Sequence, residues 1–292
     1  MKNVPHVIPY QGSKRNLAKR ICTLMPKSVN TFYEPFAGSA AVTIYAASNN
    51  LAKQYVIADS LEPLAKLWEE IINHPEKTGR RYEEIWKGYA ESPDYFLKIR
   101  ERFNAEKDPV DLLYLVARCV KNAVRFNRNG DFTQSADKRR LGTRPERMKK
   151  SINEVSQLLK GRVIVRCGDF RDSIKDAKLG DLVYMDPPYH GTTYGRDKRY
   201  FMQLGRDALI EGLEFINNRD VPFILSYDGK TGNVEYADEL PEYLKMKRLW
   251  IAAGRSSQAT LSGRSEETIE SLYISRQLLH YADSWCQKGG VI

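Results

Sequence analysis

The sequence predicts an α/β fold, in which a mostly parallel sheet of seven strands has helices between its strands and a helical insertion. Three observations predict this fold. Seven short apolar or β-branched runs have the composition of strands, helical patterns alternate with the early runs, and residues 73–160 interrupt that alternation. The chain has 292 residues, which is enough for one large domain or for a domain that carries an insertion.

The expected elements follow one another in a regular order. Between the early strands, helices are expected at residues 40–51 and 61–72, and the helix at 202–218 joins the fourth strand to the fifth. A polar loop joins the last two strands, which we expect to form a hairpin added to the sheet. The strands themselves are expected at residues 30–34, 54–58, 162–167, 181–185, 222–227, 245–251 and 270–275.

The interrupting segment has the pattern of a helical insertion. It contains a polar loop rich in Arg, Asn and Lys, and we expect helices at residues 83–90, 94–103, 110–124 and 147–159. The predicted organisation is therefore a main domain formed by residues 1–72 and 161–292, with residues 73–160 inserted between its second and third strands.

Composition restricts the kind of partner and location. Lys and Arg number 46 against 37 Asp and Glu, and the net charge of +9 favours a polyanionic partner such as nucleic acid. No segment approaches the about 18 apolar residues that a membrane span needs, so we expect a cytoplasmic protein. The cysteines are far apart and no His lies at metal-ligand spacing, so we expect no metal and reduced packing roles for Cys22, Cys119, Cys167 and Cys286.

The motif Asp186-Pro187-Pro188-Tyr189 directly follows the apolar run at residues 182–185. A carboxylate only accepts hydrogen bonds, and the two prolines hold their carbonyls rigidly because they lack an amide hydrogen and have a fixed φ. Such acceptors suit the amino group of a nucleobase, and Tyr189 offers a stacking face for a base turned out of a duplex. The alternative is an ordinary strand exit that ends in a turn.

A glycine turn and an aspartate follow the first two expected strands. Gly38 ends the run Glu34-Pro35-Phe36-Ala37-Gly38, where a ligand can approach the backbone and the next helix offers free amides. Because the phosphate-binding glycine patterns are absent, the turn favours a cofactor without a pyrophosphate. Asp59 ends the second strand, where a carboxylate can accept both hydroxyls of a ribose. The alternatives are a structural turn and a helix cap.

Asp169-Phe170 follows the third expected strand, so an aspartate stands at a third strand end as well. Asp169 can accept an amino hydrogen from an adenine ring, and Phe170 can stack on that ring. The alternative is an aspartate that caps the following helix, beside a phenylalanine of the core.

In order and spacing, these motifs resemble the adenine-N6 DNA methyltransferases of the DNA adenine methyltransferase type, the D12 class of the alpha group. Pro9-Tyr10-Gln11-Gly12-Ser13-Lys14 is similar to the opening motif of that family, and the resemblance covers nearly the whole chain. It implies a Rossmann-like S-adenosylmethionine-dependent methyltransferase sheet. It also implies cofactor contacts from Tyr10, Lys14, Phe36, Gly38, Asp59, Asp169, Phe170 and Asp186, and catalytic roles for Asp186, Pro187 and Tyr189.

The family's target recognition is assigned to an insertion at the same place in the chain. Residues 125–132 resemble its recognition hairpin, with Asn129-Gly130 as a turn signal. We expect base contacts from Arg125, Asn127, Arg128 and Asn129. The nearby Lys138, Arg139, Arg140, Arg144 and Arg147 are better matched to phosphates. Residues 133–137 depart from the usual continuation, so the DNA sequence that is read is expected to differ, and a solvated basic loop is the alternative.

The resemblance implies methyl transfer from S-adenosylmethionine to N6 of a flipped-out adenine in duplex DNA, as in restriction-modification systems. Transfer to cytosine N4 and an RNA substrate are alternatives, and so is a DNA-binding protein without catalysis. A monomer is expected, with a cognate restriction endonuclease as a further partner. Solitary and phage settings are equally compatible with the motifs.

Overall fold

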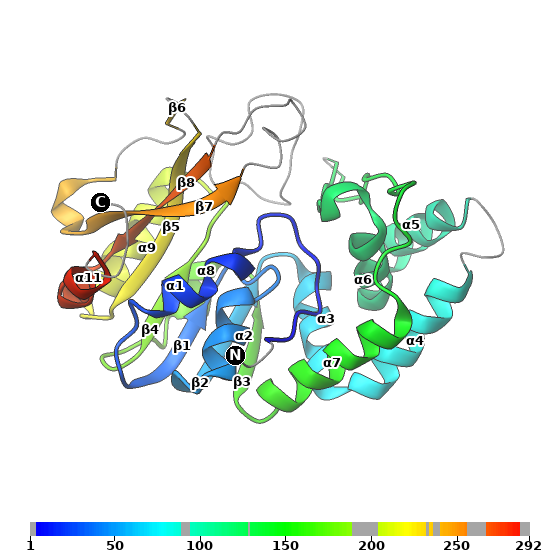
Figure 1. The fold of residues 1–292 in the computed structure, drawn as a ribbon, viewed down its shortest axis with the longest axis horizontal. Coiled ribbons are helices and arrows are strands. Elements are labelled where there is room, and N and C mark those ends of the chain that lie inside the picture. The colour runs from blue at the N-terminus through cyan, green and yellow to red at the C-terminus, as the bar shows by residue number, and fades with distance from the viewer. Residues whose placement is uncertain are drawn as a thin grey trace.

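The computed structural model describes residues 4–88, 94–127, 129–188, 204–231, 234–235, 240–255 and 267–286. A mixed sheet stands at the centre, with helices on its faces and a further group of helices beside it (Figure 1). All seven expected strands are present, and a short strand, β6 (Val234–Glu235), pairs with β5. The seven are β1 (Val29–Glu34), β2 (Ala52–Asp59), β3 (Val163–Cys167), β4 (Leu182–Met185), β5 (Phe223–Thr231), β7 (Lys247–Arg255) and β8 (Glu267–Ile274).

Across the sheet the strands follow the order β3-β2-β1-β4-β5-β8-β7. The pairs among β1 to β5 are parallel, whereas β8 is antiparallel to both β5 and β7. The last two strands therefore form the predicted hairpin. From β1 the chain builds outward to β2 and β3, and it then returns to place β4 on the other side of β1. Ligands of open α/β sheets bind at such a switch point, beyond the carboxyl ends of the strands.

Alternation along the strands divides the apolar core between the two faces of the sheet. Phe32 and Tyr55 pack in one cluster with residues of α1 (Ala18–Cys22), α2 (Ala41–Ser48), α3 (Glu62–Asn73) and α11 (Leu279–Cys286). Their neighbours Tyr33 and Val56 pack in a second cluster with α8 (Phe170–Ile174) and α9 (Arg206–Asn218). Strand β4 is buried at all four positions, as expected for a central parallel strand covered on both faces.

The helical insertion lies beside the sheet (Figure 1) and consists of α4 (Pro75–Gly88), α5 (Tyr95–Glu106), α6 (Pro109–Arg118) and α7 (Pro145–Leu159). Helix α3 contacts both α6 and α7, and α4 packs against α7. The buried side chains of the insertion belong to the same cluster as those of α3. The insertion thus shares its core with one face of the sheet, and its description as a domain of its own stays a prediction.

Two expected helices of the insertion have different bounds in the structure. Helix α4 begins at Pro75 rather than at residue 83, because a proline in the first turn has its φ preset for a helix. Helix α6 ends at Arg118 rather than at residue 124, and Cys119 is already extended (φ −75°, ψ 163°). Cys119 forms an antiparallel bridge with Ala136, so pairing with a distant segment ends this helix. A 3-10 turn, η3 (Val120–Asn122), follows it.

Short elements that the sequence did not predict complete the fold. They are α1, α8, α11 and the 3-10 helices η1 (Lys14–Asn16), η5 (Glu242–Leu244) and η6 (Arg276–Leu278). Elements of three to eight residues carry too little periodicity to be recognised in a sequence. Among the described residues no helix has both the length and the hydropathy that crossing a membrane requires.

The cysteines only partly follow their expected packing roles. Cys22 and Cys119 are buried, and burial raises the pKa of both thiols, that of Cys119 to about 12. Cys167 is exposed at the end of the edge strand β3, so the packing role was wrong for this residue. The side chain of Cys286 lies outside the described residues. In the described ranges no three His, Cys, Asp or Glu side chains gather in a way that would hold a metal ion.

Candidate active site

The predicted motifs meet at one edge of the sheet, beyond the carboxyl ends of β2, β1 and β4. These three strands are neighbours. Strand β2 ends at Asp59, β1 ends at Glu34 just before the glycine turn, and Asp186 directly follows β4. The switch point between β1 and β4 lies in the middle of this edge. Parallel pairing therefore brings Glu34, Asp59 and Asp186 to the same end of the sheet, although they are far apart in the chain.

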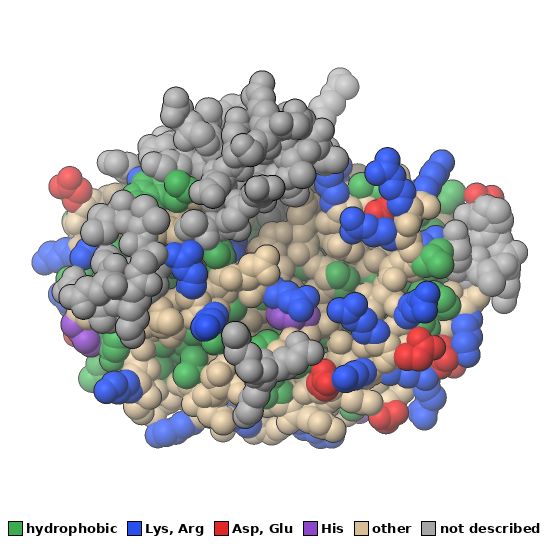
Figure 2. Space-filling model, viewed as in Figure 1, with side chains coloured by type: hydrophobic (Ala, Val, Ile, Leu, Met, Phe, Trp, Pro, Cys, Tyr) green, Lys and Arg blue, Asp and Glu red, His purple; other side chains and the backbone are tan. Residues whose placement is uncertain are grey.

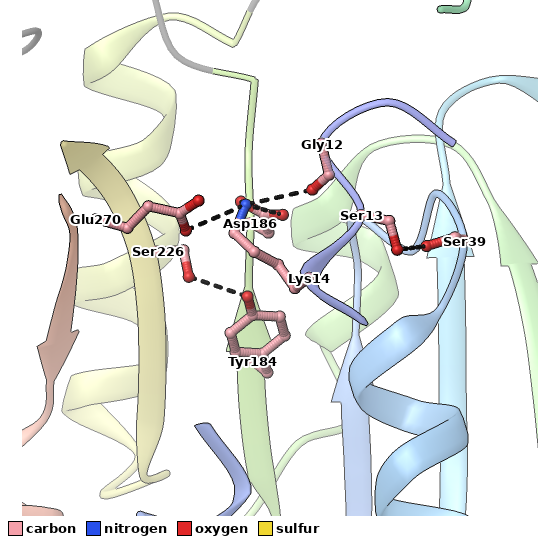
Figure 3. A network of polar contacts seen from close by, with 8 residues as sticks. All are labelled: Gly12, Ser13, Lys14, Ser39, Tyr184, Asp186, Ser226 and Glu270. Carbon is pink, nitrogen blue, oxygen red and sulfur yellow. Dashed lines mark hydrogen bonds and ion pairs between the residues drawn. The ribbon is translucent and has the colours of Figure 1, made fainter. Parts of the chain in front are cut away.

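An ion pair between Lys14 and Asp186 stands at the centre of this edge (Figure 3). Lys14 Nζ donates to Asp186 Oδ1 and Oδ2, both at 2.8 Å, and lies 3.5 Å from the carbonyl oxygen of Gly12. The Lys14 side chain is only 8% exposed, and that of Asp186 is 20% exposed. Residues 172 positions apart in the chain thus form one charge-assisted contact, which joins the opening motif to the end of β4.

The surroundings of Asp186 act on its charge in opposite directions. Burial raises the pKa of Asp186, the Lys14 ammonium lowers it, and the carboxylate of Glu270 raises it, with a net upward result. Pro187 is buried next to it, whereas Tyr189 lies outside the described residues. The site therefore holds a half-buried acceptor whose basicity is set first by burial and then by two charged neighbours.

Below Asp186, a buried hydrogen bond fixes the end of the strand. Tyr184 Oη and Ser226 Oγ are 2.9 Å apart and join β4 to β5 (Figure 3). Burial, followed by the nearby Asp186 charge, raises the pKa of the Tyr184 phenol well above its usual value. Tyr184 therefore stays a neutral support beneath the carboxylate.

On the other side of the switch point, Asp59 holds the glycine turn. Its Oδ2 accepts from the Gly38 amide and its Oδ1 accepts from the Leu61 amide, each at 3.0 Å. The Gly38 carbonyl accepts from the Trp68 indole at 3.0 Å, and Gly38 has the left-handed φ of +48° that favours glycine. Burial raises the pKa of Asp59 although these amides counteract it. A carboxylate has about four acceptor sites, so acceptor capacity remains for a ligand.

Aromatic rings and a hydroxyl pair border the turn. The Tyr10 ring lies against Gly38, where a Cβ would be 3.5 Å from the nearest ring atom. The rings of Phe36 and Phe170 are 5.0 Å apart between centroids, at 31°. Ser39 Oγ donates to Ser13 Oγ at 2.7 Å and thereby ties the opening motif to the turn (Figure 3).

The third motif shows the features of its structural alternative. Asp169 caps α8 by accepting from the Arg171 amide at 2.8 Å, and its carboxylate also binds the Arg171 guanidinium at 3.0 and 2.9 Å. These hydrogen bonds hold the pKa of Asp169 below its usual value. Phe170 is buried, and its ring packs against Gly212 of α9. An adenine contact by Asp169 and Phe170 therefore remains a prediction.

Two acidic residues of this edge were missed by sequence reasoning. Glu34 is only 4% exposed and accepts from the Thr43 amide at 2.8 Å, and its burial raises its pKa to about 7. Glu270, on β8, lies 3.6 Å from Lys14 Nζ. Glu34 stood inside a quoted motif, so the signal for it was present. For Glu270 the sequence holds none, because only the antiparallel hairpin carries it to this edge.

A hairpin is present in the insertion at the expected residues, about the isolated bridge between Phe126 and Phe132, and its role in recognition stays a prediction. The exposed Asn127 is used within the turn: its Oδ1 accepts from the amides of Asn129 and Asp131, both at 2.9 Å, and its Nδ2 donates to Asp131 at 3.0 Å. Arg125 is half-buried and Asn129 is exposed, whereas Arg128 lies outside the described residues. The base contacts of these residues remain predictions.

The basic loop after the hairpin is open to solvent. Lys138, Arg139, Arg140, Arg144 and Arg147 are all exposed, and Arg140 lies 3.7 Å from Asp137. Lys and Arg side chains also stand over the α5 and α6 end of the insertion on the face shown in Figure 2. These side chains place positive charge at the surface, where a phosphate can reach it.

Comparison with known proteins gives a matching family and several similar chains. The family described as D12 class N6 adenine-specific DNA methyltransferase matches residues 10–251. The chain is 28% identical over 279 residues to the Type II methyltransferase M.FokI of Planomicrobium okeanokoites, and 26% identical over 286 residues to the modification methylase StsI of Streptococcus sanguinis. It is also 26% identical over 263 residues to the Retron Ec67 DNA adenine methylase of Escherichia coli.

These relatives differ in how much of their own length is matched. The alignments cover 90%, 93% and 87% of this chain, but the chain spans only 42% of the first relative and 43% of the second. It spans 88% of the third.

Proposed function

Because this chain belongs to the D12 class of N6 adenine-specific DNA methyltransferases, we propose that it transfers a methyl group from S-adenosylmethionine to N6 of an adenine turned out of duplex DNA. The observation that carries the proposal is the joint position of Asp186, Lys14 and the Asp59–Gly38 turn at one switch point. The glycine turn after β1 and Asp186 after β4 thus lie at the ends of adjacent strands.

The residues present fit the proposed cofactor. Asp59 keeps acceptor capacity for ribose hydroxyls, the absence of a side chain at Gly38 leaves the backbone accessible, and the rings of Tyr10 and Phe36 offer apolar surface. The carboxylate of Asp186 suits a cationic sulfonium nearby. When bound, S-adenosylmethionine would supply an electrophilic methyl group: the N6 lone pair would form the new N–C bond, the C–S bonding pair would stay on sulfur, and N6 would release one proton to solvent water.

The protein's own contribution to this reaction is orientation and charge. Asp186 and the carbonyl of Pro187 accept the two amino hydrogens, which favours the pyramidal form of N6 with its lone pair directed at the methyl group. Tyr184 and Ser226 fix the strand end that carries these acceptors. Holding both reactants in line then lowers the barrier without a covalent enzyme intermediate. Tyr189 is proposed to stack on the turned-out base.

DNA recognition is proposed for the insertion. In this proposal Arg125, Arg128 and Asn129 reach base edges, Asn127 shapes the turn, and Lys138, Arg139 and Arg140 contact phosphates. A cognate restriction endonuclease, a monomeric state and a cytoplasmic location belong to the same proposal. The endonuclease partner is supported by relatives named as a Type II methyltransferase and a modification methylase.

The test is transfer of a labelled methyl group from S-adenosylmethionine to unmethylated genomic DNA, followed by nucleoside analysis and single-molecule sequencing. We expect label on N6-methyladenine at one short sequence, and none with Asp186→Ala. Label on cytosine, or tight DNA binding without any label, would contradict the proposal.

A further inference from the structure

Glu270 belongs to none of the motifs, yet it lies beside the central ion pair. Strand β8 runs between β5 and β7, where Glu270 pairs with Gly229 and Ile251. Figure 3 shows the Lys14 ammonium in contact with the carboxylate of Glu270 and with that of Asp186. The appended hairpin therefore brings a second acidic group to the edge that the first four strands build.

Within the described residues, Glu270 has a buried carboxylate oxygen that lies near Lys14 without a hydrogen bond. Its Oε2 is buried and accepts no hydrogen bond from any described residue, and it lies 3.6 Å from Lys14 Nζ. Lys14 is 2.8 Å from both oxygens of Asp186, so the ammonium now binds Asp186 more closely. A buried acceptor without a donor is costly, and a small movement of Lys14 would give Glu270 its hydrogen bond.

The charges of the three groups explain why a second carboxylate matters. Lys14 alone would neutralise Asp186, and it engages both of its oxygens, one of which must accept an amino hydrogen of adenine in the proposed reaction. With Glu270 included, two carboxylates face one ammonium, and one negative charge remains. Lys14 and Asp186 are mostly shielded from water, so this charge acts with less screening than it would at the surface.

We propose that Glu270 is a positioning residue that shares Lys14 with Asp186 and so keeps the catalytic cluster net negative. This inference rests on the proposed function. Drawing Lys14 toward Glu270 frees one Asp186 oxygen for the N6 amino group, and the remaining negative charge stabilises the positive charge that N6 gains as the new bond forms. The same charge favours the cationic S-adenosylmethionine over its neutral product, S-adenosylhomocysteine.

The test compares affinities for these two molecules, measured by calorimetry without DNA, in the wild type and in Glu270→Gln. We expect Glu270→Gln to lower the preference for S-adenosylmethionine by about tenfold, with the affinity for S-adenosylhomocysteine changed less than about twofold. A role in folding alone would weaken both affinities equally. In turnover we expect kcat to fall by about tenfold while the KM for DNA is retained.

Matched variants control for charge and for folding. Glu270→Asp keeps the negative charge, and we expect it to retain most of the preference. Glu242→Gln removes the same charge from an exposed site in η5, and we expect no change. If Glu270→Gln does not fold by circular dichroism, Glu270→Ala takes its place.

The outcomes separate this inference from the function on which it rests. An unchanged affinity ratio in Glu270→Gln, together with an active wild type, overturns the role of Glu270 only. A wild type that neither binds S-adenosylmethionine nor methylates DNA overturns the proposed function itself.

Discussion

At the scale of single residues, the candidate site is a set of carboxylates whose charges are set by their neighbours. Asp186 is balanced between Lys14 and Glu270, Asp59 is held by backbone amides, and Glu34 is buried against the start of α2. Asp186, Lys14 and Asp59 could be predicted because each stands at a fixed place in a motif. The contact of Glu270 with Lys14 depends on distant packing that no local pattern records, whereas the cap that Asp169 forms with Arg171 is local and was one of the two alternatives that the sequence offered.

The raised pKa of Glu34 predicts how the free energy of unfolding depends on pH. Its pKa is raised from 4.5 to about 7 by burial, so the folded state binds a proton that the unfolded state releases. The resulting stabilisation is fully present below pH 4.5 and is lost as pH rises through 7. Glu34→Gln mimics the protonated form. We expect its unfolding free energy, relative to the wild type, to rise by about 2–3 kcal/mol between pH 4.5 and 8.

The measurement is urea unfolding of both proteins across this pH range. Taking the difference between them cancels the other carboxylates, such as Asp59 and Asp186, which titrate in both proteins. A difference that does not change with pH would mean that Glu34 titrates as an ordinary exposed glutamate.

At the scale of elements, long-range contacts decide what local periodicity left open. The strands and the longer helices were predicted, since their apolar patterns extend over many residues. The end of α6 was not, because Cys119 pairs with Ala136 and Asn122 donates to the Val116 carbonyl at 2.9 Å. The hairpin was expected from its Asn-Gly turn, but its attachment to α5 was not.

That attachment depends on Asn104 of α5. Its Oδ1 accepts from the Phe132 amide at 2.7 Å, and its Nδ2 donates to the Phe132 carbonyl at 3.2 Å. Asn104→Ala leaves two backbone groups of a buried residue without these partners, so we expect a loss of about 1–3 kcal/mol in unfolding free energy. Hydrogen exchange should localise the loosening to the hairpin. The exposed Asn129→Ala is the control. Equal effects of the two variants would rule out Asn104 as the attachment of the hairpin to α5.

The packing of α9 on α8 gives a second prediction at this scale. A Cβ at Gly212 would lie 2.5 Å or less from two atoms of the Phe170 ring, so Gly212→Ala must displace that ring. We expect a cost of about 1–3 kcal/mol and a weaker affinity for S-adenosylmethionine. Gly205→Ala, at the N-cap of the same helix, meets nothing within 4 Å and serves as the control. Unaltered cofactor affinity in Gly212→Ala would argue against a cofactor role for Phe170.

At the scale of the whole molecule, one face of the mixed sheet shares an apolar cluster with the insertion, and basic side chains are spread over the face shown in Figure 2. Alternating strands and helices predicted the parallel part of the sheet, and the net charge of +9 predicted a polyanionic partner. The register of the appended hairpin could not be predicted, because antiparallel pairing to β5 depends on the assembled sheet.

Salt dependence tests the phosphate contacts of the basic loop. Replacing Lys138, Arg139 and Arg140 by Gln removes three exposed charges. If each neutralises one phosphate, the slope of log K against log salt concentration should become less steep by about 3. Fluorescence anisotropy with duplex DNA at several salt concentrations measures this slope. An unchanged slope would place the DNA elsewhere on the molecule.

The central claim is that methyl transfer takes place where Asp186 meets Lys14. The most direct measurement is the single-turnover rate of methyl transfer by Asp186→Asn, with cofactor and DNA both saturating so that binding losses do not contribute. Asparagine keeps the shape but loses the charge, and its amide is a donor. We predict a rate at least about 100-fold below that of the wild type. A rate within about threefold of the wild type would contradict the account, because the carboxylate would then not act on the amino group.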